Sequence, residues 1–155
     1  MGAGETERTG DSRMSRANYS EDLEQWEIAM WRGQVASAIR GKRGQKFLRD
    51  LLVALDALPD KSLIRDELQN QDGEVCAIGA LGLAHGIDMS DLDPEEPVSV
   101  AAAFDIAEQL AREVAYMNDE YYDTETPEAR YVSMKKWVVS LIKSAPVERQ
   151  ELPEG

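Results

Sequence analysis

The sequence predicts an all-α single domain of four to five helices in an orthogonal or bundle-like arrangement, and it allows a short β-hairpin near residues 62–75. Three observations predict this fold class. Apolar residues recur at three- and four-residue spacing in several segments, capping residues and Gly or Pro stops bound those segments, and no stretch alternates long enough for a sheet. The length of 155 residues, 43% of them hydrophobic, suits one domain with a core of its own.

The periodic segments divide the chain into three parts. Residues 1–18 are polar and contain glycine without periodicity, so we expect them to be disordered. A helical domain is expected over residues 19–143. Residues 144–155 are expected to form a disordered C-terminal tail.

The first helix is predicted to start at Ser20, whose hydroxyl can cap free backbone N–H groups, and to end at the Gly41–Gly44 segment. Trp26 and Trp31 lie about 140° apart around a helix, so both cannot face the same core centre. One of them is therefore expected to be partly exposed or to mark a second contact surface. The predicted inner face consists of Leu23, Trp26, Met30, Trp31, Val35, Ala38 and Ile39.

The second helix is predicted over residues 45–58 and stops at Pro59. Its strong apolar stripe indicates a central core element. Residues 62–68 fit a short helix or a strand, with a brief extended piece or single turn preferred, and residues 69–73 form a turn. The stripe of the second helix consists of Phe47, Leu48, Leu51, Leu52, Leu55 and Leu58.

The segment GEVCAIGALGLAHG, residues 73–86, contains the chain's one cysteine and one histidine. Gly79 and Gly82 each lower helix stability by about 1 kcal/mol relative to Ala. Together with Cys76 they form a strip on the helix surface that has almost no side-chain bulk. We therefore predict close packing of a neighbouring helix on this strip. On one continuous helix, Cys76 and His85 would lie ~13.5 Å apart along the axis and ~180° around it, so they cannot form a catalytic dyad.

Cys76 is accordingly predicted to be buried and inert, with a redox or modification site, or a catalytic thiol, as less favoured alternatives. His85 is predicted to interact favourably with the negative end of its helix, and a ligand or base role is the alternative. No catalytic residue, cofactor or metal ion is predicted for the chain.

The longest helix is predicted over residues 97–118, followed by a loop. Thr126 and Pro127 then give the clearest helix start in the chain, and that helix is expected to reach about Lys143. The predicted inner faces are Val100, Ala103, Phe104, Ala107, Leu110, Ala111, Val114 and Met117 for the longest helix, and Met134, Trp137, Val138, Leu141 and Ile142 for the last.

The net charge of −13 is unevenly distributed along the chain. Residues 31–49 contain six bases and no acid, whereas residues 60–127 contain 17 acids and three bases. The acidic body should repel nucleic acid, but the basic end can contact a phosphate or an acidic partner. An ordinary helix–helix turn with exposed bases is the favoured interpretation of that end, and a contact with an anion or an acidic partner is the alternative. Its candidate partner-binding residues are Arg40, Lys42, Arg43, Lys46 and Arg49.

Two acidic segments are weaker candidates. Residues 88–96 invite a calcium site but lack the order of an EF-hand loop, which favours a solvated acidic loop. Residues 118–122 fit a helix C-terminal cap or, with two adjacent tyrosines, an interaction surface. The partner-binding candidates in these segments are Asp88, Asp91, Asp93, Asp119, Glu120, Tyr121 and Tyr122.

Composition also bears on location. The longest apolar stretches are far shorter than the roughly 20 residues of a membrane span, and the N-terminus has no apolar signal region. A single cysteine cannot form an internal disulfide, which fits a reducing compartment. A cytoplasmic protein without a membrane partner is therefore expected.

Four blocks of the chain carry a resemblance: RGKRGQKFLRDLLVALDALPDKSLI, GEVCAIGALGLAHGIDMSDLDPE, YMNDE and TPEARYVSMKKWV. Over residues 40–138 the chain resembles an uncharacterised family of small proteins found in bacteriophages, prophages and bacterial genomes. The resemblance implies a phage or mobile-element setting and carries no assigned activity.

The leading hypothesis is a non-enzymatic acidic binding protein that occludes a basic surface of a host or phage protein complex. In the setting that the resemblance implies, this would be an inhibitor of a host defence or regulatory complex, similar to an anti-CRISPR protein. The alternatives are a structural or scaffolding homodimer formed through the first helix and a nucleic-acid-associated regulator that uses the basic cluster, which the net charge opposes. An enzyme that depends on Cys76 is the least favoured.

Overall fold

The computed structural model describes residues 25–121 and 126–143. Within these ranges the chain forms six α-helices and no strand, which confirms the all-α prediction. The expectations for residues 1–18 and 144–155, the cap at Ser20, and Tyr122 lie outside the described residues.

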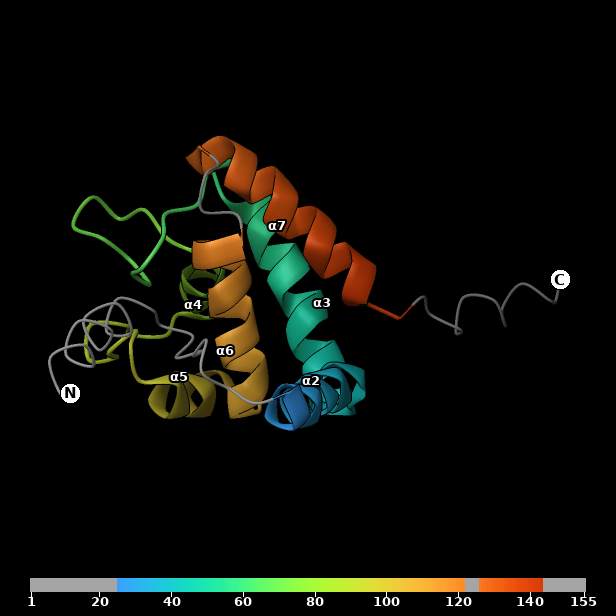
Figure 1. Cartoon of the computed structure of the whole chain (residues 1–155). Helices are drawn as coiled ribbons and strands as arrows, with labels where there is room; N and C mark the ends of the chain where they lie inside the picture. The colour runs from blue at the N-terminus through green and yellow to red at the C-terminus, as the bar shows by residue number, and fades with distance from the viewer. Residues whose placement is uncertain (1–24, 122–125, 144–155) are drawn as a thin grey trace, which may run out of the picture.

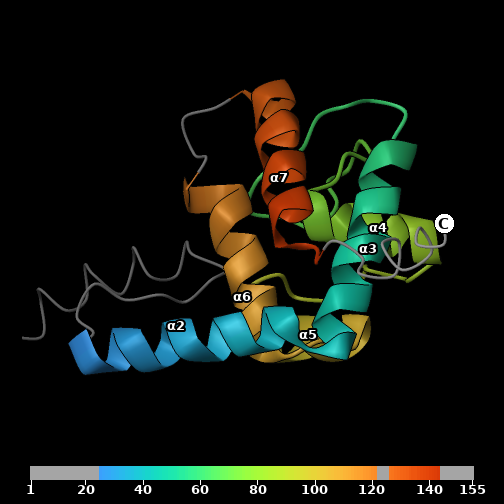
Figure 2. The ribbon, with the colours of Figure 1, turned by 90° about the vertical axis from the view of Figure 1, so that its right-hand side faces the viewer.

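Three helices, α3, α6 and α7, lie beside one another, and α2 lies across the lower ends of α3 and α6 (Figures 1 and 2). Helix α4 packs mainly on α3, and α5 leads into α6 at the base. The helices are α2 (Gln25–Arg40), α3 (Lys42–Ala57), α4 (Ala77–His85), α5 (Pro97–Phe104), α6 (Glu108–Tyr116) with the π-helical turn η1 (Met117–Tyr121), and α7 (Pro127–Leu141).

The core lies where α3, α6 and α7 meet α4. The predicted stripe of α3 is its centre, because Leu48, Leu51 and Leu55 have no exposed surface. Each fully buried leucine contributes about 1.5–3 kcal/mol relative to an exposed one. Fully buried residues of the neighbouring helices complete the core: Leu110, Val114, Met134 and Val138.

Only Gly41 separates α2 from α3, so the prediction of a break over the whole Gly41–Gly44 segment is wrong. Lys42 and Arg43 belong to the first turn of α3. A Cβ atom on Gly44 would overlap the carbonyl oxygen of Ala38, so Gly44 allows the two helices to meet at this sharp corner. The corner is joined to the end of α7 by the buried side chain of Gln45, which donates to the carbonyl oxygens of Ile39 (2.8 Å) and Leu141 (3.0 Å) and accepts from the Lys143 amide (2.8 Å).

The prediction of one long helix over residues 97–118 is also wrong. The chain breaks at Asp105, which has a left-handed backbone with φ of 57°. This break turns α5 away from α6 and leaves both Phe104 and Ile106 buried. Asp is among the few residues other than Gly that adopt this conformation at modest cost, so no Gly or Pro marks the break.

The predicted start of α7 is present in the structure. The Thr126 hydroxyl accepts a hydrogen bond from the Ala129 amide (3.1 Å), and Pro127 is the first helical residue. The helix ends at Leu141, slightly before the predicted Lys143, because the chain there turns towards Gln45.

Helix α2 is attached by one side only. Val35 is its one fully buried residue among those described, whereas Trp26 is 62% and Met30 54% exposed. Trp31 is half-buried, and the Arg112 guanidinium lies 4.2 Å from the centroid of its ring. The prediction that Trp26 and Met30 lie on the inner face is therefore wrong, whereas the expectation that one of the two tryptophans is partly exposed is confirmed.

Candidate functional site

Two loops pack on the glycines of α4. A Cβ atom on Gly79 would overlap the carbonyl oxygen of Leu68, in the loop of residues 59–76. A Cβ atom on Gly82 would contact the thioether of Met89, in the loop of residues 86–96. The predicted close approach is therefore made by two loops, and the expectation of a neighbouring helix on this strip is wrong.

Cys76 lies outside this helix as its N-cap residue. Its buried sulfur accepts a hydrogen bond from the Gly79 amide at 3.4 Å. His85 is the last residue of the unbroken helix and is exposed. The helix therefore places the thiol and the imidazole at its two opposite ends.

The loops that α4 supports carry most of the acidic surface. Leu68 of the first loop and Pro94 of the second line one small cavity of about 10 Å³, so the loops lie next to each other. Figure 1 shows both on the side of the molecule opposite α3. Their only bases are Lys61 and Arg65. We define the acidic loop surface as the ten exposed carboxylates Asp60, Asp66, Glu67, Asp72, Glu74, Asp88, Asp91, Asp93, Glu95 and Glu96.

A buried asparagine of η1 holds the first loop. Asn118 has no exposed surface. Its Oδ1 accepts from the amide of Ala77 (3.2 Å), and its Nδ2 donates to the carbonyl oxygen of Ile64 (2.9 Å) and to Oδ1 of Asp119 (2.8 Å). One side chain thus joins the loop, the start of α4 and the end of α6.

Two charged residues extend this cluster, and both are almost fully buried. Oδ1 of Asp119 accepts from the amide of Asp66 (3.1 Å), a residue with a left-handed backbone. Arg130, on the first turn of α7, donates from Nη1 to the carbonyl oxygen of Leu63 (3.0 Å). We define the loop clamp as Asn118, Asp119 and Arg130, which together bind backbone groups of the loop between Leu63 and Asp66.

The interpretation of Asp119 as part of an exposed interaction surface must therefore be corrected. Asp119 is 1% exposed and serves the interior, while Tyr121 is 60% exposed and Glu120 is half-buried. The sequence did contain a sign of this arrangement, because Arg130 falls on the same helical stripe as the buried Met134 and Val138. The π-helical geometry that directs Asn118 and Asp119 inwards has no comparable sequence pattern.

The outer parts of both loops are fixed by side-chain hydrogen bonds to the backbone. Oδ1 of Asn70 accepts from the amides of Asp72 (3.0 Å) and Glu74 (2.9 Å), and one antiparallel bridge joins Gln69 to Val75. The allowed β-hairpin is therefore reduced to a single bridge. In the second loop, hydrogen bonds from the side chain and amide of Ser90 lower the pKa of the Asp88 carboxyl.

These turns leave the carboxylates pointing to solvent rather than to a common centre. Among the described residues, no three His, Cys, Asp or Glu side chains come together in a way that could hold a metal ion. The arrangement of the acidic loop surface instead suits contact with an extended basic surface.

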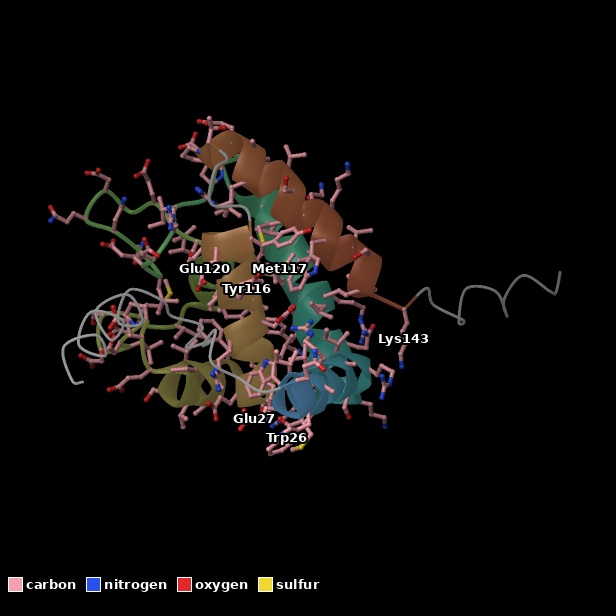
Figure 3. The ribbon with its side chains drawn as sticks, in the orientation of Figure 1. Trp26, Glu27, Tyr116, Met117, Glu120 and Lys143 are labelled. Atoms are coloured by element: carbon pink, nitrogen blue, oxygen red, sulfur yellow. The ribbon has the colours of Figure 1, made fainter. Side chains whose placement is uncertain are left out.

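The basic cluster lies on a different part of the molecule, at the α2–α3 corner. All five predicted residues are exposed, and Arg43 and Lys46 form ion pairs with Asp105 (3.4 Å) and Asp50 (2.7 Å). Lys143 adds a further cation, because its Nζ donates to the carbonyl oxygen of Arg40 at 2.9 Å (Figure 3). An open pocket of about 200 Å³ lies beside this cluster, lined by Arg43, Lys46, Phe47, His85, Phe104 and Asp105 among others.

No family model, curated protein or solved structure matches the chain. Among the described residues, no helix combines the length and the apolar character needed to cross a bilayer.

Proposed function

We propose that the chain is a non-enzymatic binding protein whose acidic loop surface docks on a basic, nucleic-acid-binding surface of another protein and occludes it. One observation supports this proposal above the others. Ten exposed carboxylates, with only Lys61 and Arg65 as opposing bases, extend from two adjacent loops on one side of the molecule. Such a surface is complementary in charge to a protein that binds nucleic acid through Lys and Arg side chains. The opposite charges also accelerate the encounter of the two proteins.

The rigidity of the loops supports the same proposal. A loop that is ordered only on binding loses conformational entropy, which weakens the complex. Here the loop clamp fixes residues 63–66, Asn70 fixes the turn, and the glycines of α4 bring both loops against the helix. The carboxylates are therefore presented on a backbone that is already ordered before the partner arrives.

The resemblance to phage and prophage proteins narrows the proposal. In that setting the partner is a host or phage protein complex in the cytoplasm, and the chain is an inhibitor of a host defence or regulatory complex, similar to an anti-CRISPR protein. This narrower form rests on the resemblance alone. It predicts that adding the chain releases the complex from its nucleic acid.

The experiment is affinity capture from a bacterial lysate at about 50 mM and about 500 mM salt, since screening weakens contacts between exposed charges. Captured proteins are identified by mass spectrometry and then purified. We expect a basic nucleic-acid-binding protein that is captured at low salt and that loses its nucleic acid when the chain is added. A partner whose affinity is the same at both salt concentrations would contradict the proposal.

A charge-matched pair of variants makes the test specific. The triple variant Glu67→Gln, Asp91→Asn, Glu95→Gln removes three charges from the acidic loop surface without removing a hydrogen-bonding side chain described above. The control variant Asp50→Asn, Asp56→Asn, Glu128→Gln removes three charges from α3 and α7. We expect the loop variant to lose at least about tenfold in affinity, and the control to keep most of it. Equal losses would mean that net charge, and not this surface, determines binding.

The basic cluster supports a second candidate, a regulator that contacts nucleic acid directly. The supporting observation is that its five bases are all exposed around the α2–α3 corner. This candidate requires salt-sensitive binding of labelled DNA or RNA that weakens when Lys42 and Arg49 are changed to Gln. The absence of such binding at about 50 mM salt would exclude it.

A further inference from the structure

Helix α2 presents a second stripe of residues to the outside. Trp26, Met30, Gly33 and Ser37 follow one another at four- and three-residue intervals and are all exposed. Apart from the adjoining backbone of α2 itself, no heavy atom lies within 4 Å of where a Cβ atom of Gly33 would be. We define these four residues as the outer stripe of α2. Figure 2 shows α2 lying along the base of the molecule, and Figure 3 shows Trp26 at its lower edge.

We propose that the outer stripe of α2 binds the same stripe of a second copy of this chain in an antiparallel, two-fold symmetric pair. A two-fold axis between residues 31 and 32 places Met30 opposite the partner's Gly33 and Trp26 opposite the partner's Ser37. Each large side chain then meets a small one, and Gly33 provides the space that Met30 fills. An isologous interface requires this kind of self-complementarity, since both copies use the same patch.

The charges at the two ends of α2 favour the same arrangement. Glu27 lies in the first turn of the helix. The other end has Arg40, with Lys42 and Arg43 directly after it. Antiparallel pairing brings the acidic start of one helix towards the basic end of the other, at both ends of the interface. Parallel pairing would bring like charges together, so the charge pattern favours the antiparallel dimer.

The pair forms without rearranging the monomer, because the opposite side of α2 is already engaged. Arg32 forms two hydrogen bonds with Glu113 of α6 (2.8 and 3.0 Å), and Trp31 stacks under Arg112. One helix pair buries less than the ~800 Å² per partner of a standard interface, so we expect a dissociation constant in roughly the micromolar range.

The first test is the mass of the full-length chain in solution, measured by sedimentation equilibrium from about 1 to about 300 µM, a range that brackets the expected dissociation constant. We expect a monomer–dimer equilibrium. Gly33→Leu should raise the dissociation constant at least about tenfold, because leucine is a good helix former that fills the space needed by Met30 of the partner. Val53→Leu, at an exposed position of α3, is the matched control and should leave the equilibrium unchanged.

The second test distinguishes the orientation with a short bis-maleimide cross-linker, using the wild-type chain with its buried Cys76 as the background control. In the antiparallel pair, the two copies of Gly33→Cys lie ~4.5 Å apart along the axis, whereas those of Ser37→Cys lie ~16.5 Å apart. We expect efficient cross-linking of Gly33→Cys alone. In a parallel pair the two copies of each variant lie level along the axis, so cross-linking of both variants indicates a parallel pair and overturns the proposal. Cross-linking of Ser37→Cys alone also overturns it, because it requires a different two-fold axis.

Other occupants of the stripe give different results. A wild-type chain that stays monomeric at about 300 µM overturns the proposal. Acrylamide quenching of Trp26 fluorescence then shows whether this side chain is exposed to solvent or is covered by other residues of the same chain. A dimer that Gly33→Leu does not weaken uses another surface and also overturns the proposal. The triple variant of the acidic loop surface should dimerise normally, so this proposal and the proposed function can fail independently.

Discussion

The 59–76 loop and helix α2 differ in how tightly the rest of the molecule holds them, and the difference is the opposite of what their secondary structure suggests. The 59–76 loop has almost no regular structure, yet three buried side chains and a glycine contact fix its backbone. Helix α2 is regular over 16 residues, yet Val35 is its one fully buried residue among those described. The loop is therefore held more tightly than the helix.

The physical reason is that the two regions satisfy their backbone groups differently. A helix satisfies its own N–H and C=O groups, so it can remain a helix while it packs loosely. The loop has no internal ladder, and its buried backbone groups need partners from elsewhere. Those partners are the loop clamp, so the irregular segment becomes the more constrained one.

The largest expected effect follows from removing the centre of the clamp. Asn118→Ala should lower the free energy of unfolding by about 3 kcal/mol, because it leaves the amide of Ala77 and the carbonyl of Ile64 without this buried partner. Urea denaturation measures the loss, and hydrogen exchange should show faster exchange at Ala77. Asn70→Ala, in the exposed turn, is the control and should cost about 1 kcal/mol. Equal costs at the two positions would show that the clamp is not what fixes the loop.

The next effect compares two glycines, one in each region. Gly79→Ala should destabilise the protein by about 2 kcal/mol despite the better helix propensity of alanine, because its Cβ atom would overlap the backbone oxygen of Leu68. Gly33→Ala, in open space on α2, should stabilise the monomer by about 0.5–1 kcal/mol. Thermal unfolding of dilute protein measures both, and the same sign for both changes would contradict the difference in packing.

A smaller effect is expected at the attachment of α2. Arg32→Met removes the bidentate partner of Glu113, whose side chain is 6% exposed. Because the Arg32 side chain is 51% exposed, the loss should be only about 1–2 kcal/mol. Hydrogen exchange should become faster in α2 and stay unchanged in the 59–76 loop. Faster exchange in both regions would mean that they unfold together.

The smallest effect depends on pH. Burial raises the pKa of Tyr131, whose hydroxyl donates to the carbonyl oxygen of Leu55 at 2.8 Å. The folded state therefore favours the neutral phenol, so its contribution is complete below pH 10.0, the ordinary pKa, and is lost as the pH rises through the raised value. Urea denaturation from neutral pH to above pH 10 should show a smaller loss for Tyr131→Phe than for the wild type. An identical loss would assign the alkaline destabilisation to other groups, of which Tyr116 also has a raised pKa through burial.

Much of the fold could be predicted from local patterns. The stripe of α3 and the Thr126–Pro127 start of α7 depend on spacing and capping within one helix, and both are present in the structure. The break at Asp105 could not be predicted, because its left-handed backbone is stabilised by burying Phe104 and Ile106 in the tertiary core. The site was predicted only in part. The acidity of the 86–96 loop could be read directly from the sequence. The loop clamp could not be predicted in this way, because it joins residues more than 50 positions apart.

The sequence by itself determined that this chain is helical, where some of its helices start or stop, as at Pro127 and before Pro59, and that its charge is divided between a basic corner and acidic loops. These properties depend on short-range periodicity, capping and composition, which act within a few residues. Only the tertiary structure decided that the side chains of the loop clamp point inwards and hold a loop. It also decided that loops, and not a helix, pack on Gly79 and Gly82, and that Trp26 faces outwards. The reason is that these outcomes depend on which distant backbone groups need a partner and which faces the other helices cover.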